Sequence, residues 1–420
     1  MKRALKVTGF AAGLLVILLV LLSAYVLAVW DRADPRSAPS FTAPRDSATL
    51  ARGEYLFKVT WQCYGCHQSG PPDGNRPPSG GRAFNLRTIG PGFGIYYSRN
   101  ITPDTATGIG LWTDGEILQA IREGVRKDRH TLFPIMPMEW LKDLSDQDGL
   151  AIVAYLRSIP AVHNPVPPAE PSFVAKALFA FNVLKPGPPI ERPIVAPPAG
   201  VTPEYGRYMA TAAAGCGDCH TPRNLQSGEF YMDSLFAGSS FRFGEPEGDP
   251  LTAFARNITP EPGEGIGEWT EREFVNAVTA GFRPDSTALT PHMPYAEYKF
   301  LAEDDLRAIY LYLTSIPPVR RSTPPPAYSA ALQGARGADR GKMLFAARCQ
   351  PCHGERGMGE RVTSVRLAEA VPLYTDQDLR TFVEEGQVDL KMPGFRKTLS
   401  RSDLDDIIAY IRTWEAPVRQ

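Results

Sequence analysis

The residues of this chain best suited to chemistry follow a pattern that occurs three times: two cysteines separated by two residues, with a histidine directly after the second. The copies are CYGCH at 63–67, CGDCH at 216–220 and CQPCH at 349–353. On a helical turn, two thiols at this spacing can each add to a haem vinyl group, and the histidine then lies under the iron as proximal ligand. The pattern therefore predicts three covalently bound haem c groups. The predicted attachment residues and proximal ligands are Cys63, Cys66, His67, Cys216, Cys219, His220, Cys349, Cys352 and His353.

A zinc site or a thioredoxin-like dithiol is the alternative for each motif. Zinc would need further Cys or His ligands, but every cysteine belongs to a motif, and the only other histidines are His130, His163 and His292. A dithiol enzyme has no reason to place a histidine after the second cysteine in every copy. Haem attachment is the favoured interpretation, and we expect His130 and His292 to pack or to contact solvent.

A Met-Pro pair follows each motif, with Met136 in FPIMP, Met293 in PHMP and Met392 in LKMP. A thioether is a soft ligand that, on the face of the iron opposite histidine, raises the reduction potential and completes the coordination. A single methionine is more often a core residue, but the repetition favours the ligand role here. Met138 competes with Met136 in the first part, and alignment with HMPY favours Met136.

Two helices are expected to enclose each site. Each part closes on an amphipathic segment whose apolar residues recur at three- and four-residue spacing. From methionine to the tyrosine in this segment the distance is 19, 19 and 18 residues, which indicates one docking geometry. The closing segments are 146–160, 303–317 and 401–414, and their tyrosines are Tyr155, Tyr312 and Tyr410.

Glycines and acidic residues at matching positions support this arrangement. A glycine upstream of each motif, having no side chain, would let the closing helix approach closely. An aspartate near the start of each closing helix is expected to cap it or to face its dipole. The glycines are Gly53, Gly206 and Gly341, and the aspartates are Asp146, Asp304 and Asp403.

The first two parts contain an insertion that the third lacks, with NITP followed by GIG and a tryptophan at 97–117 and 254–274. Histidine and methionine lie 69 and 73 residues apart in these parts, and 39 apart in the third. One interpretation is a loop that covers the haem edge. The other is that arginine and tryptophan hold the haem propionates, with the arginines forming charge-assisted bonds. The residues concerned are Arg99, Trp112, Arg256 and Trp269.

Proline-rich stretches divide the 420 residues, which contain 40 prolines, into three parts. Such stretches favour extended conformations and are typical of semi-rigid linkers, so separate haem domains are expected. The net charge of −1 gives no excess of basic residues of the kind that nucleic-acid binding requires. The predicted boundaries are 1–30 for an anchor or signal, 48–160 for domain one, 161–200 for a linker with a short apolar helix, 201–317 for domain two, 318–334 for a linker and 335–420 for domain three.

The N-terminus carries Lys2, Arg3 and Lys6 before an uncharged apolar run at 9–30. This run is about long enough to cross a ~30 Å hydrocarbon core as a helix. A cleaved signal is the alternative, but its apolar region would be shorter and no A-x-A-like site stands out. The prediction is a single anchor in the bacterial inner membrane, with the haem domains in the periplasm.

The repeated helix, haem motif, Met-Pro and closing helix resemble class I cytochrome c domains, which are all-α. The three motifs, the paired NITP segments and the Met-Pro pairs together resemble the tri-haem cytochrome c subunit of membrane-associated alcohol, gluconate and aldehyde dehydrogenases, over nearly all of 50–420. Two departures are the apolar segment 172–185, where members usually carry a more aromatic helix with a Trp, and the uncleaved N-terminus. The resemblance implies a catalytic partner subunit of quinoprotein, flavoprotein or molybdenum type.

The expected function is electron transfer from that partner to quinone or a terminal oxidase. We find no nucleotide-binding loop and no Ser-His-Asp order, so no substrate site is expected in this chain. A haem enzyme of the di-haem peroxidase or thiosulfate-oxidising type is one alternative, but it needs an open iron face, and each predicted iron has a methionine available. An integral subunit of a respiratory complex is the other alternative.

Overall fold

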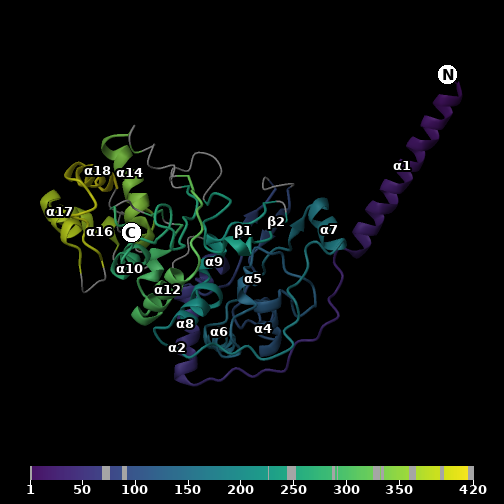
Figure 1. The fold of residues 1–420 in the computed structure, drawn as a ribbon, viewed down its shortest axis with the longest axis horizontal. Coiled ribbons are helices and arrows are strands. Elements are labelled where there is room, and N and C mark those ends of the chain that lie inside the picture. The colour runs from purple at the N-terminus through teal and green to yellow at the C-terminus, as the bar shows by residue number, and fades with distance from the viewer. Residues whose placement is uncertain are drawn as a thin grey trace.

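The computed structural model describes residues 2–414 apart from 69–75, 88–91, 226, 244–251, 286–288, 291, 325–331, 333–334, 359–365 and 388–391. The described chain is mostly helical, and one long helix, α1 (Lys2–Val29), projects from an otherwise compact body (Figure 1). We call residues 48–160, 201–317 and 335–414 the first, second and third part.

The helices of the first two parts recur in the same order, whereas in the third part the four-residue helix comes before the ten-residue helix and not after it. In the first part they are α2 (Ser47–Tyr55), α3 (Tyr64–His67), α4 (Asp114–Glu123), α5 (Met138–Leu141) and α6 (Asp146–Ser158). In the second they are α8 (Pro203–Tyr208), α9 (Cys216–His220), α10 (Glu271–Ala280), α11 (Tyr295–Tyr298) and α12 (Glu303–Ser315). In the third they are α14 (Gly337–Arg348), α15 (Gln350–His353), α16 (Leu367–Ala370), α17 (Asp376–Glu385) and α18 (Arg401–Ile411).

Each part is built on one helix crossing: α2 on α6, α8 on α12 and α14 on α18. At each crossing a glycine faces the backbone of the closing helix, as its lack of a side chain predicts. A Cβ atom would lie 1.9 Å from the nearest carbonyl oxygen in the first part and 1.8 Å in the other two. The glycine and carbonyl pairs are Gly53 and Ala151, Gly206 and Ala308, and Gly341 and Asp406.

The predicted aspartates lie in the first turns of the closing helices, where they face the helix dipole. None of them is the N-cap residue, so of the two expected roles the helix-dipole role is the one that all three fill. Ser145 and Ser400 cap α6 and α18, because their hydroxyls accept hydrogen bonds from the third backbone N–H of the helix. Asp403 completes the second cap as its reciprocal partner.

The first and second parts share one hydrophobic core, with Leu56 and Ile152 from the first and Met209 and Leu313 from the second. Two π-helical turns, Leu56–Thr60 and Met209–Ala213, precede the first two motifs at this junction. The third part has its own core, which also takes in Phe282 of the second part. The expectation of separate domains joined by stiff linkers is therefore wrong for the first two parts.

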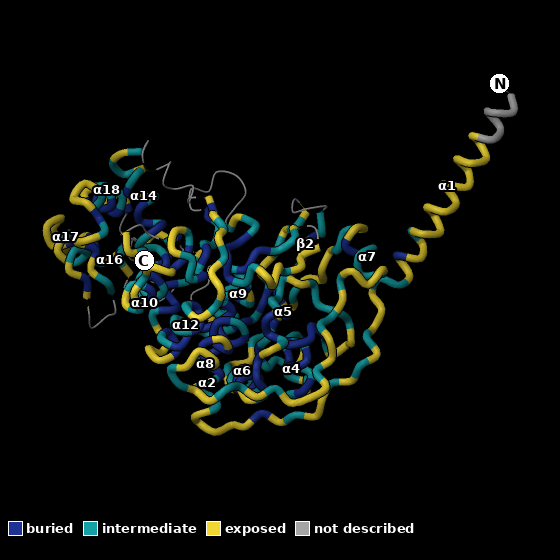
Figure 2. Tube along the Cα trace, in the orientation of Figure 1, coloured by how far each residue is buried: buried dark blue, intermediate teal, exposed yellow. Residues whose placement is uncertain are grey.

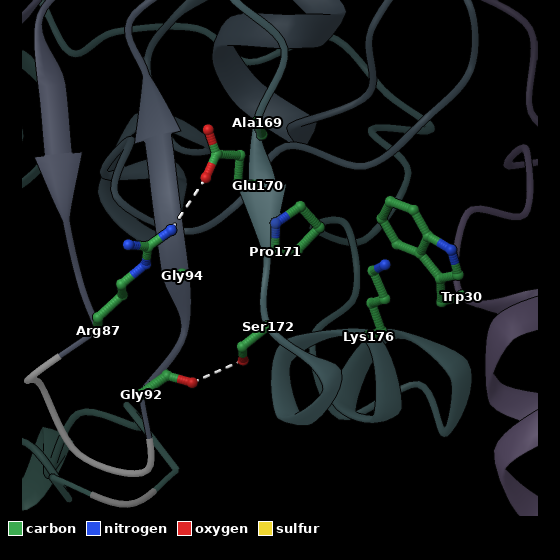
Figure 3. Close-up of a pocket in the computed structure, with 9 residues that line it drawn as sticks. All are labelled: Trp30, Arg87, Gly92, Gly94, Ala169, Glu170, Pro171, Ser172 and Lys176. Carbon is green, nitrogen blue, oxygen red and sulfur yellow. Dashed lines mark hydrogen bonds and ion pairs between the residues drawn. The ribbon is translucent and has the colours of Figure 1, made fainter.

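Residues 161–200 run back over the first part instead of forming a spacer. Within them, β3 (Glu170–Pro171) pairs with β2 (Gly94–Tyr97), which pairs with β1 (Ala83–Asn85), in an antiparallel sheet. The Arg87 and Glu170 side chains pair at 3.0 Å beside this sheet (Figure 3). The expected all-α fold is thus corrected to a mostly helical one with a small sheet, whose strands of two to four residues are too short to give an alternating pattern.

The segment 161–200 also contains α7 (Phe173–Ala180), the predicted short apolar helix, which contacts α1. The apolar stretch Thr8–Val29 of α1 has a mean hydropathy of 2.8 and is almost wholly exposed (Figure 2). Its length and composition suit a membrane span. Of the second predicted linker, 318–334, residues 325–331 and 333–334 lie outside the described residues.

Candidate haem sites

The first two haem motifs open into one cavity of about 1330 Å³. Single small-molecule pockets measure about 300–1,000 Å³, so this volume suits two large groups in adjacent crevices. The structure brings the predicted residues of both sites to its wall. The lining includes Cys63, Cys66, His67, Met136, Cys216, Cys219, His220 and Met293.

The two motif histidines of this cavity are each oriented by a backbone carbonyl. Nδ1 of His67 lies 2.9 Å from the oxygen of Arg99, and Nδ1 of His220 lies 2.7 Å from the oxygen of Arg256. A carbonyl oxygen can only accept, so Nδ1 carries the proton and the Nε2 lone pair is left for a metal. Burial lowers the pKa of both imidazoles, which favours the neutral, ligating form.

The NITP segments place these carbonyls. Oδ1 of Asn100 accepts hydrogen bonds from the amide and the hydroxyl of Thr102, at 3.0 and 2.7 Å, while its Nδ2 donates to the oxygen of Val162 at 2.8 Å. The second part repeats this arrangement with Asn257, Thr259 and Val319. The asparagine thus connects the NITP segment to the residues that follow the closing helix. This connection holds the carbonyl of the preceding arginine next to the motif histidine.

The arginine side chains of the same loops also reach the cavity wall. Arg99 donates to the carbonyl of Pro167 at 2.8 Å, and Arg256 donates to that of Thr323 at 2.6 Å. Burial, followed by the charge of a neighbouring arginine, lowers the pKa of both. The neighbours are Arg126 and Arg283, which line the cavity as well.

Sequence reasoning missed this second pair of arginines. Gly124 and Gly281 end α4 and α10 in the left-handed conformation, and Arg126 and Arg283 follow them by two residues. The shared pattern, EGVR in one part and AGFR in the other, is the signal that would have identified them.

The arginine pairs fit a group that carries carboxylates. Two cations that lie close together in a half-buried wall repel one another unless an anion joins them. In the described residues, Nε of Arg256 and Nε of Arg283 are buried and make no hydrogen bond. A haem edge with its two propionates would supply acceptors for such donors.

The motif cysteines are partly covered, except Cys66, which is exposed. Burial raises the pKa of Cys63 and Cys216 to about 12 and that of Cys219 and Cys349 to about 12 as well. A redox-active or nucleophilic cysteine requires a depressed pKa, because the thiolate is the reactive form. The thioredoxin-like alternative is therefore not favoured.

The third motif lies apart from this cavity, with Cys349, Cys352 and His353 on or next to α15. Met392 pairs through its backbone with Gln387 and packs against the same core as Cys349. Burial lowers the pKa of His353 to about 4. No described residue accepts a hydrogen bond from Nδ1 of His353, in contrast to the first two motif histidines.

The structure separates Met136 from Met138 and places the three histidines that lie outside the motifs. Met136 lines the cavity, whereas Met138 is buried against Gly124, at whose position a Cβ would lie 1.9 Å from the sulfur. His130 reaches the cavity with Nδ1 2.8 Å from a carboxylate oxygen of Asp31. His163 is exposed, with Nδ1 3.6 Å from a carboxylate oxygen of Asp104, and His292 is an exposed residue of the cavity lining.

Two tryptophans of the first part pack against glycines beside and inside the second haem motif. The ring of Trp61 lies over Gly215, and that of Trp140 lies over Gly217 inside the second motif. The indole of Trp61 also donates to the oxygen of Ala212 at 2.9 Å. The two haem motifs are thus held together by direct packing.

Comparison with known proteins agrees with this geometry. Residues 336–411 match the family model described as cytochrome c oxidase, cbb3-type, subunit III. The chain is 28% identical to the cytochrome c subunit of a quinone alcohol dehydrogenase from Gluconacetobacter polyoxogenes, covering 89% of this chain and 81% of that one. It is 29% identical to the fructose dehydrogenase cytochrome subunit of Gluconobacter japonicus (79% and 68%) and 28% identical to the gluconate 2-dehydrogenase cytochrome c subunit of Pantoea cypripedii (89% and 88%).

The helix crossings, the oriented histidines and the matching domain define a c-type cytochrome. The relatives given above are named as cytochrome subunits of alcohol, fructose and gluconate dehydrogenases. The chain is similar over most of its length to cytochrome c subunits of dehydrogenases, and its function is electron transfer.

Proposed function

We propose that this chain carries three haem c groups and relays electrons from a catalytic dehydrogenase subunit to quinone or a terminal oxidase. The observation that carries the proposal is the repeated site in which a motif histidine donates through Nδ1 to a loop carbonyl while a methionine lines the same cavity. Each bound haem supplies one iron that accepts and gives up a single electron.

The proposed residues follow from the motifs and the cavity. The three cysteine pairs hold the haems, His67, His220 and His353 ligate one face of the irons, and the three methionines ligate the other. The arginine pairs of the first two parts orient the propionates. The proposed methionine ligands are Met136, Met293 and Met392, and the arginine pairs are Arg99 with Arg126 and Arg256 with Arg283.

The proposed architecture is three tandem cytochrome c domains at 48–160, 201–317 and 335–420. The three glycine-mediated helix crossings support this division. The first two domains would act as one unit because their cores are continuous. The direct packing of Trp61 and Trp140 on the second motif keeps their haem sites adjacent, which suits rapid exchange of electrons between them.

The proposed location is the outer face of the bacterial inner membrane, with α1 as an uncleaved anchor. The exposed apolar stretch Thr8–Val29 supports the span, and the basic residues before it favour a cytoplasmic N-terminus. The catalytic partner is inferred from the relatives, whose names identify them as subunits of alcohol, fructose and gluconate dehydrogenases.

Purification from solubilised membranes tests the proposal. An alkaline pyridine spectrum and the intact mass should agree on three covalent haems per chain. The isolated chain should not oxidise alcohols, aldehydes or sugar acids, whereas the copurifying subunit together with its substrate should reduce the haems. Turnover by the isolated chain, or rapid binding of carbon monoxide to a reduced native haem, would instead favour a haem enzyme.

A further inference from the structure

An apolar surface lies beside the end of α1. It consists of Phe173, Val174, Phe181 and Val183, on α7 and just after it, and we call it the α7 surface. These side chains are between 38% and 55% exposed, although they fall within eleven residues. Soluble proteins rarely expose several large apolar side chains together, and such patches mark interaction sites.

The position of this surface is set by contacts between α7 and α1. The rings of Tyr25 and Phe181 lie 5.9 Å apart, and Nζ of Lys176 lies 5.1 Å from the centre of the Trp30 ring (Figure 3). Val26 is the buried residue of the apolar span, and Ala175 that of α7. The α7 surface thus lies beside the end of α1, which is exposed over most of its length (Figure 2) and whose exposed residues are mostly apolar.

Charge and residue type both fit the boundary between lipid chains and headgroups. The segment 172–185 contains Lys176 and Lys185 and no acidic residue. Lysines reach toward lipid phosphates while their stems cover apolar surface. Trp30 and Tyr25 stand at the end of the span, the level at which aromatic rings concentrate in membrane proteins.

We infer that the α7 surface lies in the bilayer, at the headgroup level of the membrane that α1 spans. This inference extends the single-span attachment proposed above and rests on it for the place of α1. The occupant is phospholipid, because the surface lies beside an apolar span and carries only positive charge. Interfacial helices bind in this way, with apolar side chains toward the acyl region.

A second contact fixes the orientation of the first haem site, which a single span would leave free to rotate. The inner side of α7 carries Phe179, which lines the haem cavity and whose ring lies 6.3 Å from that of Phe133. One short helix therefore has lipid on its outer side and the cavity on its inner side.

Site-specific depth measurements on the full haem-loaded chain test the inference. All six native cysteines are expected in thioether bonds, so an introduced cysteine gives a unique thiol for a spin label. The test positions are Val174→Cys and Val183→Cys, with Leu18→Cys in α1 as the lipid reference. Leu373→Cys, 79% exposed on the third part, is the aqueous reference. Each protein is reconstituted in vesicles of phosphatidylethanolamine and phosphatidylglycerol, and a native haem spectrum verifies folding.

The ratio of the spin label's collision rate with oxygen to its collision rate with a water-soluble nickel chelate reports the depth of the label in the bilayer. We expect ratios at 174 and 183 several-fold above that at 373. Ratios equal to that at 373, with 18 in lipid, would overturn the inference and leave the span intact. Labels at 174 and 183 that neither reagent reaches would indicate a protein partner and would also overturn it. Lipid-like ratios at 174 and 183, together with a water-like ratio at 18, would support membrane contact of the α7 surface and refute the membrane span of α1.

Discussion

The indole of Trp61 lies against Gly215, so closely that a Cβ on the glycine would come within 2.4 Å of the ring. Trp61 precedes the first haem motif by two residues and Gly215 directly precedes the second. This contact therefore couples the two motifs physically, and it can be tested by adding one methyl group.

Gly215→Ala is predicted to destabilise the joined first and second parts. Two costs combine: left-handed backbone strain of roughly 1–2 kcal/mol at φ 62°, and an overpacking term of about 1–3 kcal/mol from Trp61. Gly228→Ala is the matched control, because Gly228 has a φ of 77° and no atom within 4 Å of its Cβ position. Urea unfolding followed at the haem band measures the difference, and equal losses would show that the tryptophan contact contributes nothing.

Gly341→Ala is predicted to loosen the third part alone. The new methyl group would collide with the carbonyl of Asp406, 1.8 Å away, and separate α14 from α18 at a cost of about 1–3 kcal/mol. Gly200→Ala, where nothing lies within 4 Å, is the control. Thermal unfolding should show an earlier transition for one haem while the other two keep theirs; a uniform shift of all three would contradict the separate third core.

Met136→Leu is predicted to lower the potential of one haem and to admit carbon monoxide, because the thioether ligand is lost while the volume is kept. Met138→Leu, at a buried position beside Gly124, should leave both properties unchanged. Redox titration and carbon monoxide spectra of the two variants decide between the methionines. The reverse result would move the ligand to residue 138.

Arg283→Leu is predicted to lower the potential of the middle haem by an amount on the order of tens of millivolts, since a nearby cation favours the reduced, less positive state. Arg307→Leu removes a half-exposed arginine of the same part that pairs with Glu271, and it serves as the charge control. Spectroelectrochemical titration measures both. Equal potentials in the two variants would exclude Arg283 from the propionate site.

Residues local in sequence were the most predictable. The motif spacing singled out His67 and His220, which the structure places in one cavity, and the repeat singled out the glycines that face the closing helices, because each signal lies within a single helix or turn. The arginines at 126 and 283 were missed because their role depends on a loop about 27 residues upstream, which only the fold brings beside them. The joined core was hidden for a related reason: proline-rich composition describes the stiffness of a segment but not the surface on which it lies.

The continuous core of the first two parts has a consequence for how this protein is made. Leu56 packs in a core completed by Leu313, some 250 residues later. In the export proposed above, the first CxxCH motif crosses the membrane before the residues that complete its core, so this core stays incomplete until α12 has emerged. On the proposal that Cys63 and Cys66 bind haem, both stay accessible to the attachment machinery during this period, whereas the third motif is enclosed by helices that lie close to it in the sequence. We expect stalled export before residue 313 to yield the first two parts still unfolded and sensitive to proteases.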